Sequence, residues 1–183
     1  MKITILGAGA WGTALARLLL SPTGLAAANP HRGEPNALTL WGHVPEWLEE
    51  IRQARSNERF LPGIRLPDTL RLESDVARAI DGAECVVVAV PSQPFRQVTR
   101  HLGAYSGLVV SVTKGIEYDT GLTMCGVLGQ TAPRATAVAL SGPSFAAEVA
   151  RDIPTAIVAA SRDAQAAAAV QEWSPSSPSS TRD

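Results

Sequence analysis

The sequence predicts an α/β protein with a doubly wound, mostly parallel sheet. Short apolar runs alternate with longer amphipathic stretches from the N-terminus to about residue 173, which is typical of repeated strand–helix units. The run Cys85–Val90 is apolar throughout, as expected of a central strand that helices cover on both faces. The glycine-rich stretch Gly7–Gly12 stands between the first apolar run and the first helical pattern, where such sheets make their first strand-to-helix turn.

The alternation places strands and helices in turn along the chain. The apolar runs predict strands at residues 2–6, 37–41, 69–72, 84–90, 107–113, 136–140 and 155–160. The amphipathic stretches between them predict helices at residues 10–20, 45–55, 75–81, 93–102, 121–130, 144–150 and 162–173. We therefore expect one domain over residues 1–173, with a Pro- and Gly-rich surface insertion at 21–36 and a disordered Ser- and Pro-rich tail at 174–183.

The composition argues against nucleic acid and membranes as partners. The 16 basic and 17 acidic residues are interspersed, so the chain carries no large field of one sign. No apolar run approaches the roughly 18 residues of a membrane span, and the N-terminal apolar run is too short for a signal peptide. We expect a cytoplasmic protein with small-molecule partners. Cys85 and Cys125 stand far apart, which predicts reduced thiols rather than a disulfide or a metal site.

Gly7, Gly9 and Gly12 form a GxGxxG pattern that follows an apolar strand and opens a helix. In that context the first glycine permits a tight turn and the second lets the backbone approach a pyrophosphate. The third allows the helix to pack closely on the strand, and free N–H groups at the helix start face the phosphates. The pattern predicts a Rossmann-like site for a dinucleotide.

The end of the second strand favours NADP as cofactor without excluding NAD. An acidic residue normally stands there and binds the adenosine ribose, but this strand ends Leu40-Trp41-Gly42-His43. His43 is able to bind a 2′-phosphate instead, and a solvated loop histidine is the alternative. Three arginines are candidates to help it: Arg32, Arg52 and Arg55.

Three later strands also end in small or polar residues, at 91–93, 113–115 and 141–146. Because the carboxyl ends of parallel strands meet at one edge of a sheet, these loops and the glycine turn should line a single crevice. Lys114 is conspicuous there, since Lys2 is the one other lysine among many arginines. Its compact ammonium suits contact with a phosphate or carbonyl oxygen.

Two further features flank this lysine. Residues 141–144 look like a helix start, with a proline near the first helical position and backbone donors that could hold an anion; a plain helix cap is the alternative. Glu117 and Asp119 follow Lys114 closely, and we expect them to be solvated residues of a turn.

The chain resembles the bacterial NAD(P)-dependent glycerol-3-phosphate dehydrogenases over about residues 1–173. The matching segments are GAGAWGTALA at 7–16, LWGH at 40–43, RFLPGIRLPDTL at 59–70, VAVPSQ at 88–93, SVTKGIEYDTG at 111–121, SGPSFAAEVA at 141–150 and PTAIVAAS at 154–161. Many families share the glycine motif, whereas the TKGIE and SGPSFA segments in this order are specific to this one.

The resemblance implies reversible hydride transfer between NAD(P)H and dihydroxyacetone phosphate, which yields sn-glycerol 3-phosphate for phospholipids. The candidate cofactor contacts are then Gly7, Gly9, Ala10, Trp11, Gly12, His43, Lys114 and Ala146. The candidate substrate contacts are Lys114, Gly142 and Ser144, of which Lys114 is the catalytic candidate because it touches both cofactor and substrate.

The chain departs from this family after about residue 173. Members continue into a helical second domain that carries the general-acid lysine, and that domain is missing from this sequence. We expect a truncated fragment that binds cofactor and turns over poorly or not at all, with a homo-oligomer left open. Two alternatives remain: a stand-alone NAD(P)-binding module without catalysis, or a related dehydrogenase acting on another substrate, such as 6-phosphogluconate or ketopantoate.

Overall fold

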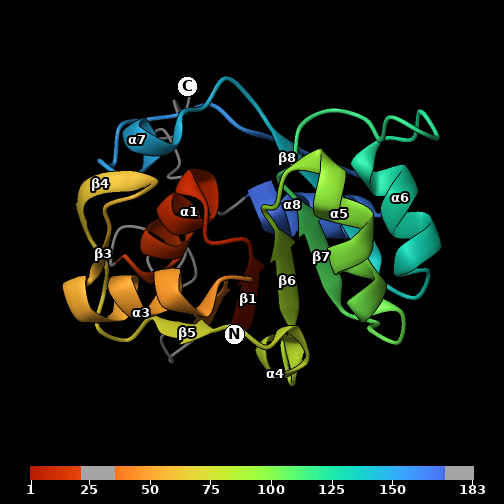
Figure 1. Ribbon diagram of the computed structural model, residues 1–183. Coiled ribbons are helices and arrows are strands. Elements are labelled where there is room, and N and C mark those ends of the chain that lie inside the picture. Colours follow the sequence, from red (N-terminus) through yellow and green to blue (C-terminus); the bar gives the residue numbers. More distant parts are fainter. Residues whose placement is uncertain (22–35, 172–183) are drawn as a thin grey trace, which may run out of the picture.

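A seven-stranded sheet forms the centre of the protein (Figure 1). The structure is a computed structural model that describes residues 1–21 and 36–171. The strand order is β5-β2-β1-β6-β7-β8-β9. The strands are β1 Lys2–Leu6, β2 Ala37–Trp41, β5 Arg71–Glu73, β6 Cys85–Val88, β7 Leu108–Ser111, β8 Thr136–Ser141 and β9 Val158–Ser161. All neighbours pair in parallel except β8 with β9, which confirms the predicted doubly wound, mostly parallel sheet.

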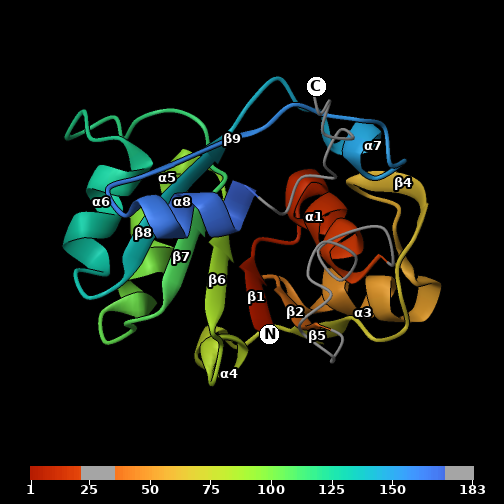
Figure 2. The same ribbon diagram turned by 180° about the vertical axis from the view of Figure 1, so that it is seen from behind.

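Helices cover both faces of this sheet. Figure 1 shows α5 on the near side of the sheet at β7, with α6 beside it, and Figure 2 shows α8 across the opposite face. The helices are α1 Ala10–Leu20, α3 Pro45–Ala54, α4 Val76–Ile80, α5 Ser92–Thr99, the 3-10 helix η1 Arg100–Leu102, α6 Met124–Thr131, α7 Ala146–Val149 and α8 Ala164–Gln171. Two caps fit their sequence, because the side chains of Asp75 and Thr123 accept hydrogen bonds from the first turns of α4 and α6.

The side chains of β6 explain why its sequence is apolar without alternation. Cys85 and Val87 belong to the core cluster under α1, α3 and α8, whereas Val86 and Val88 belong to the cluster under α4, α5 and α6. All four are fully buried. A strand that is covered on both faces needs apolar side chains on both faces, and the prediction of a central strand here is confirmed.

Two corrections to the predicted elements concern residues 56–73. Residues 56–65 form a β-hairpin that was not predicted, with β3 at Ser56–Asn57 and β4 at Leu61–Arg65. The sequence signal was weak because β3 has two residues and Pro62 and Gly63 interrupt β4. The strand predicted at 69–72 lies at 71–73 and forms the edge of the sheet.

The structure confirms the expectation about the cysteines, whereas two predicted segments lie outside the residues that it describes. Cys85 and Cys125 are free thiols, as predicted, and burial raises the pKa of Cys85 to about 12. The predicted tail at 174–183 and residues 22–35 of the predicted insertion lie outside the described residues. No helix within residues 1–21 and 36–171 is long and apolar enough to cross a membrane.

Candidate functional site

The turn between β1 and α1 has the backbone geometry that its glycines predict. Gly7 has φ +126°, and a Cβ there would lie 2.8 Å from the carbonyl carbon and oxygen of Ala89. Its N–H donates to the carbonyl oxygen of Trp41 at 3.0 Å. The turn is therefore held between the carboxyl ends of β2 and β6, the two strands on either side of β1.

Gly12 and Gly9 have opposite surroundings. A Cβ on Gly12 would lie 1.9 Å from the carbonyl oxygen of Gly7, so α1 starts directly against the turn. A Cβ on Gly9 would have no heavy atom within 4 Å. Gly9 is also the N-cap of α1, and it has no side chain that could cap the helix. The first N–H groups of the helix are therefore available to an anion beside open space.

Asn57 holds this turn from the hairpin, a role that sequence reasoning missed. Its side chain is 2% exposed and donates to the carbonyl oxygen of Ala8 at 3.0 Å and to Oγ1 of Thr13 at 2.8 Å. The N–H of Phe60 donates back to Oδ1 of Asn57 at 3.4 Å. A buried amide is tolerated because both its ends are hydrogen-bonded. Residue type alone offered no signal, since Asn57 lies in a short polar stretch that resembles an ordinary loop.

A cavity of about 210 Å³ opens beside the glycine turn. It lies between the turn, the end of β2, α3 and the hairpin. Three of the predicted segments therefore meet here: the glycine turn, LWGH at 40–43 and VAVPSQ at 88–93. The lining residues are Gly7, Ala8, Gly9, Trp41, Gly42, His43, Val44, Trp47, Leu48, Ile51, Asn57, Phe60, Ala89, Val90 and Pro91.

Aromatic rings form one wall of this cavity. The ring of Trp47 lies 6.1 Å from that of His43 and 5.6 Å from that of Phe60, both edge to face. His43 itself is exposed at the mouth. Such a wall offers flat apolar surface to a base and keeps an imidazole beside it.

The arginines predicted to assist His43 do not surround it. Helix α3 begins at Pro45, next to His43, and runs away from the carboxyl edge, so Arg52 and Arg55 lie at its far end. Arg52 pairs with Glu49, and Arg55 pairs with Asp68. The third candidate, Arg32, lies outside the described residues. The prediction for Arg52 and Arg55 was wrong because a helix of ten residues carries its two ends to opposite ends of the strands.

Lys114 lies beyond the carboxyl end of β7, on the same edge of the sheet as the glycine turn. Its Nζ donates to the carbonyl oxygen of Gly142, beyond β8, at 3.1 Å. The loops after β7 and β8 thus meet, as predicted, and bring a candidate catalytic residue to a candidate substrate contact. Lys114 is not among the residues that line the cavity at the glycine turn.

The helix start predicted at residues 141–144 was wrong. Strand β8 continues to Ser141, and α7 begins only at Ala146, with Phe145 as N-cap. Gly142 has φ +151°, and a Cβ there would lie 2.4 Å from the carbonyl oxygen of Ala156. The backbone of Ala156 lies close to Gly142, and Pro143 restricts the conformation of the residue before it. Both keep this segment out of a helix.

Three other candidates from this part of the prediction are placed as follows. Ser144 is partly buried, with its Oγ 3.5 Å from the carbonyl oxygen of Gly142. Ala146 is the first residue of α7 and packs against the core. Trp11 faces a separate small cavity between α1 and α7, with Leu15 among its neighbours. The structure therefore does not bring Trp11 and the aromatic wall together.

Glu117 is not the solvated residue that we expected. Its carboxylate accepts two hydrogen bonds of 2.7 Å from Arg96, one from Nε and one from Nη2, and a third from the hydroxyl of Thr120. Its side chain is 14% exposed. The Arg96 guanidinium, and secondarily Thr120, lower the pKa of Glu117 to about 2. This pair joins α5 to the loop that follows Lys114 and fixes that loop.

The fold and the glycine turn define the class of protein: a doubly wound α/β domain of the dinucleotide-binding kind. The comparison with family models identifies it further. Residues 2–167 match the model described as the N-terminus of NAD-dependent glycerol-3-phosphate dehydrogenase. The chain belongs to this family, which confirms the predicted resemblance and, at the level of the family, a nicotinamide dinucleotide as the class of cofactor.

Relatives with known names agree with this assignment. The chain is 41% identical, over 94% of its length, to glycerol-3-phosphate dehydrogenase [NAD(P)+] of Chlorobium phaeobacteroides, and 44% identical, over 93% of its length, to that of Syntrophomonas wolfei. Its fold matches the crystal structure of glycerol-3-phosphate dehydrogenase from Coxiella burnetii with a TM-score of 0.79 and 28% identity, over 94% of this chain and 50% of that one. The chain spans about half the length of the curated relatives it matches.

The contact between Gly12 and Gly7 yields a prediction about stability. We expect Gly12→Ala to lower the free energy of unfolding by about 2 kcal/mol or more, because the added methyl group overlaps backbone that cannot move aside cheaply. Urea unfolding measures the change. The matched control is Gly129→Ala in α6, where a Cβ meets no atom within 4 Å; it should leave stability equal or slightly higher. Equal stability of the two variants would contradict this account of the turn.

The pair between Arg96 and Glu117 yields a prediction about pH. The pKa of Glu117 is lowered to about 2 in the folded chain, whereas an unfolded glutamate titrates at about 4.3. The stabilisation is therefore fully present above about pH 5 and is lost as the pH falls towards 2. We expect Glu117→Gln to be less stable than wild type at pH 7, with a difference that narrows steadily below pH 5 in denaturant titrations. Asp119→Asn, in the same loop, is the control. A difference that does not vary with pH would rule out the ion pair as its source.

Proposed function

We propose that this chain is the cofactor-binding half of an NAD(P)-dependent glycerol-3-phosphate dehydrogenase. The observation that carries the proposal is the open space at Gly9, the N-cap of α1, which lines a cavity with an aromatic wall. Membership of the glycerol-3-phosphate dehydrogenase family supports the substrate pair, dihydroxyacetone phosphate and sn-glycerol 3-phosphate.

In this proposal the residues divide the cofactor between them. The N–H groups of Ala10 and Trp11, with the open backbone at Gly9, receive the pyrophosphate. The cavity walls at His43 and Phe60 receive the adenosine, and the nicotinamide end extends along the edge of the sheet towards Lys114. Cofactor contacts by the Trp11 side chain and by Ala146 remain predictions.

When bound, a nicotinamide cofactor supplies or takes up the hydride of the reaction. The task left to this chain is to hold the reacting groups and stabilise charge. The ammonium of Lys114, hydrogen-bonded to the carbonyl oxygen of Gly142, is available to an oxygen of the substrate, and Gly142 and Ser144 are proposed to approach the same molecule. The proton that the carbonyl oxygen gains must come from another acid, the lysine that the resemblance places in a second domain.

Three finer predictions accompany the proposal. The reaction supplies a phospholipid precursor, the protein is cytoplasmic, and the chain alone turns over poorly or not at all. A stand-alone cofactor-binding module is the second candidate, favoured by the half-length match to the relatives.

Cofactor binding tests the proposal directly. We expect the chain to bind NADH or NADPH and Gly9→Ala to weaken that binding by about tenfold or more, because a methyl group would occupy the approach of the pyrophosphate and cost at least one charge-assisted hydrogen bond. Quenching of tryptophan fluorescence measures the affinity. The melting temperature should be unchanged, since a Cβ at Gly9 touches nothing, and Gly129→Ala serves as the control.

Three outcomes bear on the two candidates, and the last of them separates the dehydrogenase from the module. A folded chain that binds neither cofactor would remove both the dehydrogenase and the module. Binding without reduction of dihydroxyacetone phosphate agrees with either, and a coding sequence that continues in frame beyond residue 183 into a lysine-bearing helical region would exclude the module.

A further inference from the structure

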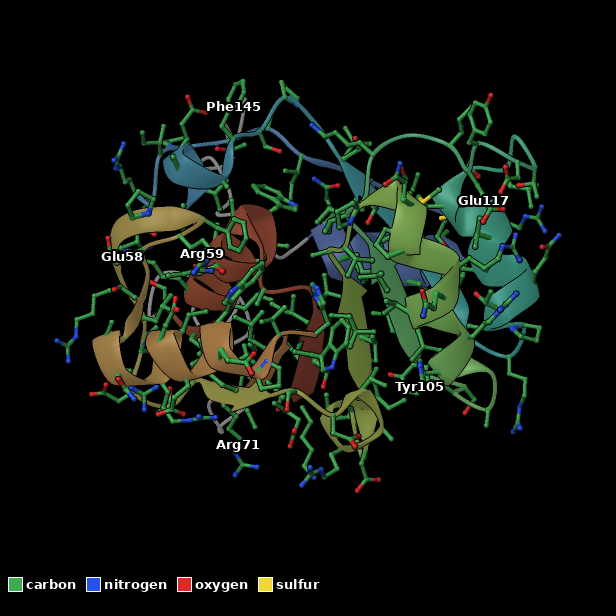
Figure 3. All side chains as sticks on the ribbon, in the orientation of Figure 1. Glu58, Arg59, Arg71, Tyr105, Glu117 and Phe145 are labelled. Carbon is green, nitrogen blue, oxygen red and sulfur yellow. The ribbon has the colours of Figure 1, made fainter. Side chains whose placement is uncertain are left out.

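Arg59 lies beside the cavity at the glycine turn, between the two strands of the β3–β4 hairpin. The central carbon of its guanidinium is 4.6 Å from the centre of the Trp47 ring, and Trp47 lines the cavity. Figure 3 shows Arg59 in the space between the hairpin and α3. The hairpin thus places a cation against the aromatic wall, at a residue that was not among the predicted cofactor contacts.

This guanidinium is only loosely held. Its Nη2 lies 3.4 and 3.5 Å from the two carboxylate oxygens of Glu50, which is long for a charge-assisted hydrogen bond. The guanidinium of Arg96, in contrast, makes two bonds of 2.7 Å with Glu117. The side chain of Arg59 is 46% exposed, and within residues 1–21 and 36–171 Glu50 is its one hydrogen-bond partner. Its remaining donors are free for a stronger acceptor.

The surroundings favour a phosphate as that acceptor. His43 lies against the same indole as Arg59, with its ring 6.1 Å from that of Trp47. The strand before it ends at Trp41, and Gly42 follows. The residues after β2 thus lack the acidic side chain that would bind a ribose 2′-hydroxyl and repel a 2′-phosphate. His43 therefore follows β2 where an acid is usual, and the guanidinium of Arg59 lies on the indole that His43 contacts.

We propose that Arg59 determines cofactor specificity by binding the 2′-phosphate of NADP, with His43 on the other side of the phosphate. The inference rests on the proposed function, because it requires a dinucleotide in this cavity. A planar guanidinium can give two parallel N–H donors to phosphate oxygens while it stays stacked on Trp47. The 2′-hydroxyl of NAD carries no charge to match, so the chain prefers NADP(H) to NAD(H).

The test measures the affinities of NADPH and NADH for wild type and for two variants. Wild type should bind NADPH about tenfold tighter than NADH or better, the size of one charge-assisted contact. Arg59→Met keeps an unbranched stem over Trp47 and removes the charge. It should weaken the binding of NADPH by about tenfold and the binding of NADH by less than about twofold. Arg65→Met is the matched control, because Arg65 lies on the same hairpin with its side chain 80% exposed; it should leave both affinities unchanged.

A second probe removes the nicotinamide from the comparison. In competition assays wild type should bind 2′,5′-ADP more tightly than 5′-AMP, because the two nucleotides differ in the 2′-phosphate alone. The Arg59→Met variant should lose that preference. If Arg59→Met lowers the melting temperature, Arg59→Gln replaces it in the same assays. Equal losses for both cofactors, or no loss for NADPH, would overturn the inference.

The inference and the proposed function fail in different ways. A wild-type chain that binds NADH as tightly as NADPH would refute the role of Arg59 and leave the proposed function in place. A folded wild-type chain that binds neither cofactor would refute the proposed function, and the inference with it.

Discussion

The close approach of α1 to the turn before it is the constraint on which the site depends. A side chain at residue 12 would collide with the carbonyl oxygen of Gly7 at 1.9 Å, so only glycine lets the helix begin this near the strand. This close approach also sets the direction in which the start of α1 points. The first N–H groups of α1 face the carboxyl edge of the sheet, and the open backbone at Gly9 stands in front of them.

The hairpin at residues 56–65 supports this turn from the outside. Asn57 bonds both the carbonyl oxygen of Ala8 and the hydroxyl of Thr13 from a buried position, which ties the turn and the first helical residues to one rigid element. The same hairpin contributes Phe60 to the aromatic wall and holds Arg59 against Trp47. One short element thus supports the glycine turn and also contributes to the aromatic wall of the cavity beside it.

The other half of the edge is built differently. Lys114 and Gly142 meet across two loops, and the partly buried pair of Arg96 with Glu117 secures the first of those loops. Apolar side chains remain exposed nearby, with Tyr118 at 96% and Phe145 at 70%. The described residues therefore form a cavity at the glycine turn, whereas the end of the edge that carries Lys114 leaves apolar side chains exposed. This division agrees with a chain that spans about half the length of its relatives.

Local sequence determined the sheet class, the central strand β6 and the conformation of the glycine turn, because each depends on residues close together in the chain. Apolar runs set the strands, and glycines set the turn wherever a side chain cannot fit. Tertiary structure alone decided which distant polar groups become neighbours: Asn57 with the turn, Arg59 instead of Arg52 and Arg55 with Trp47, and Arg96 with Glu117. A single sequence cannot show such pairings, since they depend on how a helix or hairpin is oriented on the sheet. The orientation of α3, which carries its last turn away from the site, is fixed by packing and not by the arginines it bears.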